Sequence, residues 1–329
     1  MRRFATLALL ALATLAANAQ QEGIRKASGQ LTVGILAMGP DSVFRELPTY
    51  ARFYAKLREL GWRDGENIRY LGRGAAGDIG KLDAGMQEFV RVALVVTVGF
   101  REALAAKRAT ATIPIVMVHP GDPVELGIVT SFNRPGGNIT GNFSAPLALS
   151  GKRVELLAEI FPAARRILSG YDAPLPSPNV VSVMNEAAKK YGLTIVPAEL
   201  PASGDYDAWV ANAKRDGAEA ALIAHASSAF RTARRKALAD ALIRHRLPAI
   251  CGTGEYVDSG CLASYSASNI EFFASAAVYV DKILRGAKPG ELPIQQPTVY
   301  EFVINRKTAQ AIELHIPEAI LFRADRVIE

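Results

Sequence analysis

The sequence predicts an α/β protein with two doubly wound parallel-sheet domains. The chain has 329 residues, which is more than a single hydrophobic core normally accommodates. Short apolar runs of strand length alternate with longer stretches of helical period, a pattern typical of parallel sheets with right-handed crossovers. This alternation restarts after Asn142, which indicates a second sheet and therefore a second domain.

The first domain is expected to begin after a tail that ends near Gln30. Apolar runs predict strands at 31–37, 67–71, 93–98 and 112–118, and a strand at 139–142 that crosses into the second domain. Helices are expected at 44–57, 79–90 and 100–108. Gly61 is expected to stop the first of these helices, and Trp62 just beyond it is expected to fill the core.

The second domain repeats the pattern. Strands are predicted at 166–169, 193–198, 220–224, 248–251 and 262–265, and helices at 152–160, 179–191, 205–213 and 231–245. An amphipathic helix at 272–284 follows, capped by Asn269 and closed by Gly286.

The N-terminus has the features of a cleavable signal peptide at residues 1–19. A short basic segment containing Arg2 and Arg3 precedes an apolar run at 4–17, and Ala17-Asn18-Ala19 predicts cleavage before Gln20. The apolar run is shorter than a membrane span requires. Because no cysteine follows it, we expect a periplasmic protein without a lipid anchor.

Charge and motifs exclude several functional classes. The net charge of +6 falls to +4 without Arg2 and Arg3, and the one basic cluster, Arg231 to Lys236, is expected to be a solvated helix face, so no nucleic acid partner is predicted. The chain has no nucleophile elbow, Walker A loop, dinucleotide fingerprint or zinc-protease motif. His119 and His225 are expected to be structural or solvated. We therefore predict neither an enzyme nor a metal site or cofactor.

Cys251 and Cys261 are the only cysteines. In an oxidising compartment such a close pair forms a disulfide, and the alternative is two small buried residues near strand ends.

Several motifs in sequence order carry a resemblance to a known family. Gly121-Asp122-Pro123 is followed by Arg134-Pro135-Gly136-Gly137-Asn138-Ile139-Thr140-Gly141, and further matching blocks lie at 152–157, 279–289, 292–298, 302–305 and 323–329. In these blocks the chain resembles the tryptophan/tyrosine-type substrate-binding proteins of ABC importers. The resemblance implies the fold of a type I periplasmic binding protein, with three crossings between the domains.

The resemblance also implies domain boundaries. The N-terminal domain is expected to comprise 28–141 and 266–297, and the C-terminal domain 142–265 and 298–329. Multiple crossings favour closure about a hinge. Asn138, Lys152 and Asp281, which lie in the family motifs, are interpreted as structural residues.

Ligands of open α/β sheets bind at the carboxyl ends of the strands, so the loops at those ends are the expected binding site. The expected ligand-binding residues are Asp41, Ser42, Phe100, Arg101, Gly121, Asp122, Asn142, Phe143, Tyr171, Asp172, Ser227, Glu255, Tyr256 and Tyr265.

Each of these residue types has a structural alternative. Asp122 either neutralises a ligand ammonium group or fixes its own turn. Arg101 lies at a helix N-terminus, where a cation opposes the helix dipole, so it either grips a ligand carboxylate or reaches solvent. The aromatic residues either stack on the ligand or belong to the core. Glu255 either contacts ligand or caps its short helix.

The resemblance implies a monomeric solute-binding component that captures a small polar solute between its two lobes and delivers it to a membrane permease driven by a separate ATPase. The expected solute is an amino acid, which includes the aromatic ones, or another small carboxylate. Its expected binding free energy is about −8 kcal/mol. The rival hypotheses are a periplasmic sensor module for a receptor and, third, an α/β hydrolase or isomerase.

Overall fold

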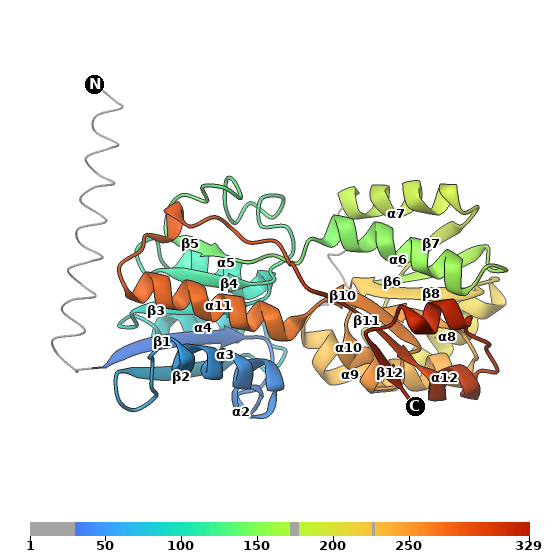
Figure 1. The fold of residues 1–329 in the computed structure, drawn as a ribbon, viewed down its shortest axis with the longest axis horizontal. Helices are drawn as coiled ribbons and strands as arrows, with labels where there is room; N and C mark the ends of the chain where they lie inside the picture. Colours follow the sequence, from blue (N-terminus) through green and yellow to red (C-terminus); the bar gives the residue numbers. More distant parts are fainter. Residues whose placement is uncertain (1–29, 172–177, 226–227) are drawn as a thin grey trace, which may run out of the picture. The chain divides into compact units, whose positions relative to one another are not determined.

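The computed structural model describes residues 30–171, 178–225 and 228–329. These residues form two compact units (Figure 1). Unit 1 comprises the chain up to Ser144 together with Asn269–Pro297, and unit 2 comprises Ala145–Ser268 together with Thr298–Glu329. The first two crossings therefore follow residues 144 and 268, where the sequence analysis placed them after 141 and 265.

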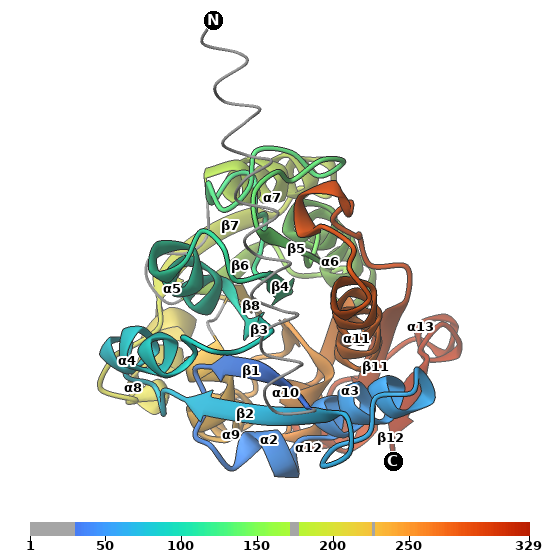
Figure 2. The ribbon, with the colours of Figure 1, turned by 90° about the vertical axis from the view of Figure 1, so that its left-hand side faces the viewer.

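Unit 1 is built on a parallel sheet in the order β2-β1-β3-β4-β5. Its strands are β1 (Leu31–Ala37), β2 (Ile68–Gly74), β3 (Leu94–Val98), β4 (Ile115–Val118) and β5 (Ile139–Gly141). Its helices are α2 (Val43–Glu46), α3 (Pro48–Glu59), α4 (Gly80–Glu88), α5 (Phe100–Ala109) and α11 (Asn269–Leu284), followed by the 3₁₀ helix η1 (Pro289–Glu291). Figure 2 shows α4 and α5 on one face of the sheet and α3 and α11 on the other, which is the doubly wound arrangement.

The strands of unit 1 are buried on both faces because helices cover both. All four residues of β4 are fully buried, as their continuous apolar sequence predicts. The expected strand at 112–118 starts only at Ile115, because the Thr110 hydroxyl accepts hydrogen bonds from the backbone N–H groups of Thr112 and Ile113 and holds them in a turn.

Unit 2 has a sheet in the order β12-β11-β10-β9-β8-β6-β7. Its strands are β6 (Arg166–Tyr171), β7 (Thr194–Glu199), β8 (Ala220–His225), β9 (Ala249–Cys251), β10 (Ala263–Ala267), β11 (Tyr300–Asn305) and β12 (Arg326–Ile328). Its helices are α6 (Pro146–Ile160), α7 (Pro178–Lys190), α8 (Tyr206–Arg215), α9 (Ser228–Arg244), α10 (Gly254–Asp258), α12 (Arg306–Ala311) and α13 (Glu318–Phe322).

The α/β fold class is confirmed, but the sheet of unit 2 is mixed. β11 pairs antiparallel with β10. Between these two strands the chain leaves unit 2 to form α11, so no βαβ crossover constrains the direction of β11.

Alternate residues of the unit 2 strands supply two cores, one on each face of the sheet. Ile167 and Leu222 join the core that also contains residues of α6, α7 and α12. Leu168 and Ile223 join the core that contains residues of α8, α9 and α10. This period of two is the reason why continuous apolar runs predict these strands correctly.

Trp62 was expected to fill the core, but it does not. It is half-buried, and its indole N–H donates a hydrogen bond of 2.8 Å to Asp281 Oδ1 on α11. Arg285, directly after the last residue of α11, lies over the indole ring with its guanidinium carbon 5.7 Å from the ring centroid. These contacts explain the family motif residue Asp281 as a structural anchor for α11.

Candidate ligand-binding site

The carboxyl ends of β1, β3 and β4 lie at one edge of the unit 1 sheet, since these strands are neighbours and parallel. The order β2-β1-β3 means that the connections leaving β1 and β3 diverge between these two strands. Ligands of open α/β sheets bind at such a switch point. The structure therefore brings the loops that carry Asp41, Ser42, Phe100, Arg101 and Gly121 to one edge.

Asp41 and Ser42 are exposed on the loop after β1. Asp41 Oδ1 accepts a hydrogen bond of 2.6 Å from the backbone N–H of Gly74 at the end of β2. A side chain at position 74 would collide with the Gly39 carbonyl oxygen, 2.4 Å from its Cβ, so the close approach of the two loops requires glycine there. The Ser42 side chain does not cap α2, the helix that follows it.

Phe100 and Arg101 open helix α5 directly after β3. Both side chains are half-buried, and the guanidinium carbon of Arg101 lies 5.4 Å from the centroid of the Phe100 ring. The cation–π contact positions the guanidinium at the edge of the sheet. A planar guanidinium in this place can bind a carboxylate with two parallel hydrogen bonds, next to an aromatic ring.

Glu102, the next residue, was missed by the sequence analysis. Its side chain is 1% exposed, and its Oε1 accepts a hydrogen bond of 2.8 Å from the backbone N–H of Met38, the first residue after β1. A Cβ at Gly99 would lie 2.7 Å from Glu102 Oε2. Glu102 therefore links the loops after β1 and β3 across the switch point. The sequence feature that could have revealed Glu102 is a second charged residue beside Arg101, in the first turn of a helix that follows a buried strand.

The charge of Glu102 also acts on the side chain of Tyr50 in α3. Tyr50 is 3% exposed, and burial first, then the nearby Glu102 carboxylate, raises the pKa of its hydroxyl far above the ordinary value. The raised pKa keeps the Tyr50 hydroxyl neutral at neutral pH.

Replacing Glu102 by Ala is expected to destabilise unit 1 by about 2 kcal/mol, because the buried N–H of Met38 loses its acceptor. Glu102→Gln keeps a side-chain oxygen in the same place and should retain most of the stability. Urea unfolding of the two variants measures the difference. Equal midpoints for Glu102→Ala and the wild type would contradict the role of Glu102 as a link between the two loops.

Asp122 fixes its own turn, as one of its two interpretations expected. Its Oδ1 accepts hydrogen bonds from the backbone N–H groups of Val124 at 2.9 Å and Glu125 at 3.0 Å. Gly121 before it has φ of +94°, a left-handed conformation that glycine adopts without strain. Gly121 and Asp122 thus determine the conformation of the loop after β4.

Asn142 is a structural hub of unit 1. It is 1% exposed, its Oδ1 accepts the backbone N–H of His119, and its Nδ2 donates to the Phe272 carbonyl oxygen and the Ser275 hydroxyl. Both amide hydrogens of Asn142 are used within unit 1. Phe143 is buried beside it and packs on Phe132 with the ring centroids 4.6 Å apart.

In unit 2 the expected residues are distributed over several strand ends. Tyr171 ends β6, half-buried, whereas Asp172 and Ser227 lie outside the described residues. Tyr265 on β10 is half-buried and stacks on Tyr300 with an interplanar angle of 5°. Glu255 lies half-buried in the first turn of α10.

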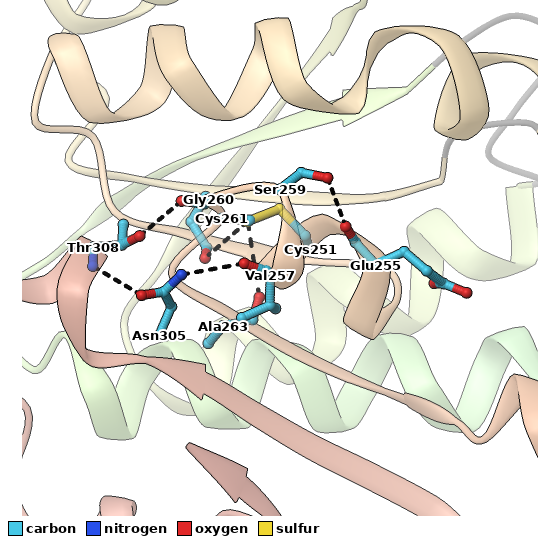
Figure 3. Close-up of a disulfide and its surroundings, with 10 residues drawn as sticks. Cys251, Glu255, Val257, Ser259, Gly260, Cys261, Ala263, Asn305 and Thr308 are labelled. Atoms are coloured by element: carbon cyan, nitrogen blue, oxygen red, sulfur yellow. Dashed lines mark hydrogen bonds between the residues drawn. A yellow bond between two sulfur atoms is a disulfide. The ribbon is translucent and has the colours of Figure 1, made fainter. Parts of the chain in front are cut away.

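Tyr256 and the two cysteines belong to a core of unit 2. Tyr256 is 1% exposed within the core formed by α8, α9 and α10. Cys251 and Cys261 are joined in a disulfide, also in this core, with their Cα atoms 6.7 Å apart (Figure 3). The bridge closes the loop that contains α10, and Asn305 Nδ2 ties the same loop to β11 through the Val257 carbonyl oxygen.

No group of three His, Cys, Asp or Glu side chains suited to a metal ion occurs in the part of the chain that the structure describes. None of the helices in residues 30–171, 178–225 and 228–329 combines the length and apolar character that a bilayer crossing requires.

Comparison with known proteins gives a family match over most of the chain. The model of the ABC transporter substrate binding protein family matches residues 47–328. A curated relative, the tyrosine-binding protein of Clostridioides difficile (strain R20291), is 25% identical over 267 residues, which cover 80% of this chain and 75% of the relative.

Solved structures support the same assignment. A conserved domain protein from Vibrio cholerae O1 is similar with a TM-score of 0.80 and 25% identity, over 91% of this chain and 99% of that one. An ABC domain from Streptococcus pneumoniae, crystallised with L-Trp, is similar with a TM-score of 0.78 and 22% identity, over 91% of this chain and 100% of that one. These likenesses confirm the type I periplasmic binding protein fold. The family model covers well over half of the chain, and the chain therefore belongs to the ABC transporter substrate binding protein family.

Proposed function

We propose that this protein captures an aromatic amino acid, or a related small aromatic carboxylate, and hands it unchanged to a membrane permease driven by a separate ATPase. Export to the periplasm with cleavage after Ala19 is part of this proposal.

The observation that carries the proposal is the pairing of Phe100 and Arg101 at the carboxyl edge of β3, beside the switch point. A ligand carboxylate would bind the Arg101 guanidinium, and the aromatic group of the ligand would lie near the Phe100 ring. Asp41 and Ser42, exposed on the neighbouring loop, would complete the unit 1 side.

In unit 2, Tyr171 and Glu255 remain candidates for ligand contact by their positions at the end of β6 and after β9, and Asp172 and Ser227 remain candidates from the sequence alone. The buried residues have a different role in this proposal. Three of the expected residues stabilise the loops without contacting ligand, because their side chains are at least nine-tenths buried in their own unit. They are Asn142, Phe143 and Tyr256.

The names of similar proteins support the choice of ligand class. One relative is a tyrosine-binding protein, and one similar structure holds L-Trp. A more distant structure of the same fold, with a TM-score of 0.54, holds 4-hydroxybenzoate. An aromatic ring with a carboxylate is common to these three ligands, and it matches the chemistry of Phe100 and Arg101.

Thermal shift measurements with aromatic and aliphatic amino acids and benzoates test the proposal. A ligand at a hundredfold its Kd should stabilise the protein by about 2.7 kcal/mol. Mass spectrometry of the recovered ligand should show it unchanged. Absence of any shift with the aromatic compounds, or chemical conversion of the ligand, would contradict the proposal.

Arg101→Ala is expected to weaken ligand binding by at least about tenfold, because a charge-assisted hydrogen bond pair is lost. The melting temperature of the variant without ligand is measured as well, so that a loss of binding is distinguished from a loss of stability. Arg91→Ala is the matched control, since Arg91 is an exposed arginine that precedes β3 at the opposite edge of the same sheet. Isothermal titration measures both variants, and an unchanged affinity of Arg101→Ala would refute the assignment.

A further inference from the structure

Unit 1 has a cavity whose lining does not include Phe100 or Arg101. A cavity of about 390 Å³ lies between α3, the loop that precedes β2, and β2 itself, and we call it the α3–β2 pocket. The residues that define it here are Tyr54, Arg58, Trp62, Asp64 and Tyr70. Its size is within the range of small-molecule sites. A larger cavity of about 760 Å³ shares Tyr54, Asp64 and Tyr70 and continues along β2 to Asp41 and Ser42.

The loop that carries Asp64 is held in one shape. Gly61, with φ of +95°, follows α3 and reverses the direction of the chain. The backbone N–H of Trp62 donates a hydrogen bond of 2.9 Å to the Leu57 carbonyl oxygen. Asn67 Oδ1 accepts the N–H of Arg63 at 2.7 Å, and Asn67 Nδ2 donates to the Gly61 carbonyl oxygen at 3.0 Å. The pocket wall is therefore formed before any ligand arrives.

Three aromatic rings line the pocket. Tyr54 and Tyr70 lie with their ring centroids 4.6 Å apart, and both rings contact the buried Phe53. The hydrogen bond from Trp62 to Asp281 fixes the third ring. Burial, followed by the charge of Asp64, raises the pKa of Tyr54 to about 12 and raises that of Tyr70 further. The Asp64 carboxylate is thus close to both neutral phenols.

The lining of the pocket contains two opposite charges, those of Arg58 and Asp64. Arg63 pairs with Glu66 at 3.5 Å, and on α3 both Arg52 and Lys56 pair with Glu59. Within the described residues, by contrast, neither the Arg58 guanidinium nor the Asp64 carboxylate makes a hydrogen bond or an ion pair. The pocket consequently offers one cation, one anion and an aromatic wall.

We propose that the α3–β2 pocket is a second binding site, for a small zwitterion with an amino-acid head group and an aromatic side group. The ligand carboxylate binds Arg58, its ammonium group binds Asp64, and its ring lies against Tyr54, Tyr70 and Trp62. Because Arg58 and Asp64 are exposed, water screens both contacts, and the expected Kd is about 1 mM. This inference does not depend on the proposed function, since none of Asp41, Ser42, Phe100 and Arg101 lines the α3–β2 pocket.

The fluorescence of Trp62 can report ligand binding in the α3–β2 pocket, because its ring lines that pocket. The chain has two tryptophans, so a Trp209→Phe protein has fluorescence from Trp62 only. Titration with L-phenylalanine should give a saturable change in Trp62 emission. Phenethylamine, which lacks the carboxylate, and 3-phenylpropionate, which lacks the ammonium group, should each bind at least about tenfold more weakly.

Arg58→Gln and Asp64→Asn should each weaken L-phenylalanine binding by about threefold, as loss of one solvent-exposed ion pair predicts. Arg52→Gln is the matched control, because Arg52 lies on the same helix but not in the pocket, and it should leave the response unchanged. The response should also survive Arg101→Ala, which separates this site from the proposed transport site. No saturable response, or a response that both pocket variants retain, would overturn the proposal.

Discussion

Loss of the Cys251–Cys261 disulfide is expected to lower the free energy of unfolding of unit 2 by about 3 kcal/mol. The two cysteines are 10 residues apart, so the bridge closes a short loop and restricts the unfolded chain by about that amount. Both side chains are 1% exposed within the core that contains Tyr256. A Cys251→Ala/Cys261→Ala double variant removes the bridge without leaving buried thiols.

Unit 2 can be followed alone, because Trp209 packs against this same core. In a Trp62→Phe background, urea unfolding monitored by Trp209 fluorescence should shift to lower urea in the double variant. Reduction of the bridged protein under denaturant should produce the same shift, and it should have no effect on the double variant. Two titratable thiols in the purified protein before reduction, or equal midpoints, would show that the bridge does not form.

Asn142→Ala is expected to destabilise unit 1 by about 3 kcal/mol, since it removes three hydrogen bonds made by a side chain that is 1% exposed. The N–H of His119, the Phe272 carbonyl oxygen and the Ser275 hydroxyl all bond the Asn142 amide. His119 has a left-handed φ of +35°, which is costly for a residue with a side chain. Its hydrogen bond to Asn142 stabilises that conformation.

Asn138→Ala is the matched control for Asn142→Ala. Asn138 Nδ2 donates to the carbonyl oxygens of Thr110 and Ile113, but the residue is only half-buried, so water can replace these bonds in part. The loss should be about 1 kcal/mol. Urea unfolding monitored by Trp62 in a Trp209→Phe background measures both variants. Equal losses would contradict the role of Asn142 as the hub.

The sequence predicted the features that depend on local patterns. Buried strands such as β3 and β4 were found because both their faces are covered and their sequences are continuously apolar. The pair of cysteines was recognised, with two alternatives open. The position of Arg101 was predicted because a helix following a parallel strand must begin at the carboxyl edge of the sheet.

The features that escaped prediction depend on residues far apart in the chain. Trp62 was expected in the core, but its partner Asp281 lies 219 residues away, on a helix that returns from the second crossing. Glu102 was overlooked because its acceptor role needs the N–H of Met38, which only the strand order places beside it. Asn142 was expected to face ligand, and nothing local indicated its partners on α11.

The most direct test of the account is a crystal structure of the mature protein with an aromatic amino acid at a concentration well below 1 mM, so that the weaker α3–β2 pocket stays largely empty. The proposed function predicts density for an intact ligand with its carboxylate on Arg101. A ligand bound away from Arg101 would contradict it.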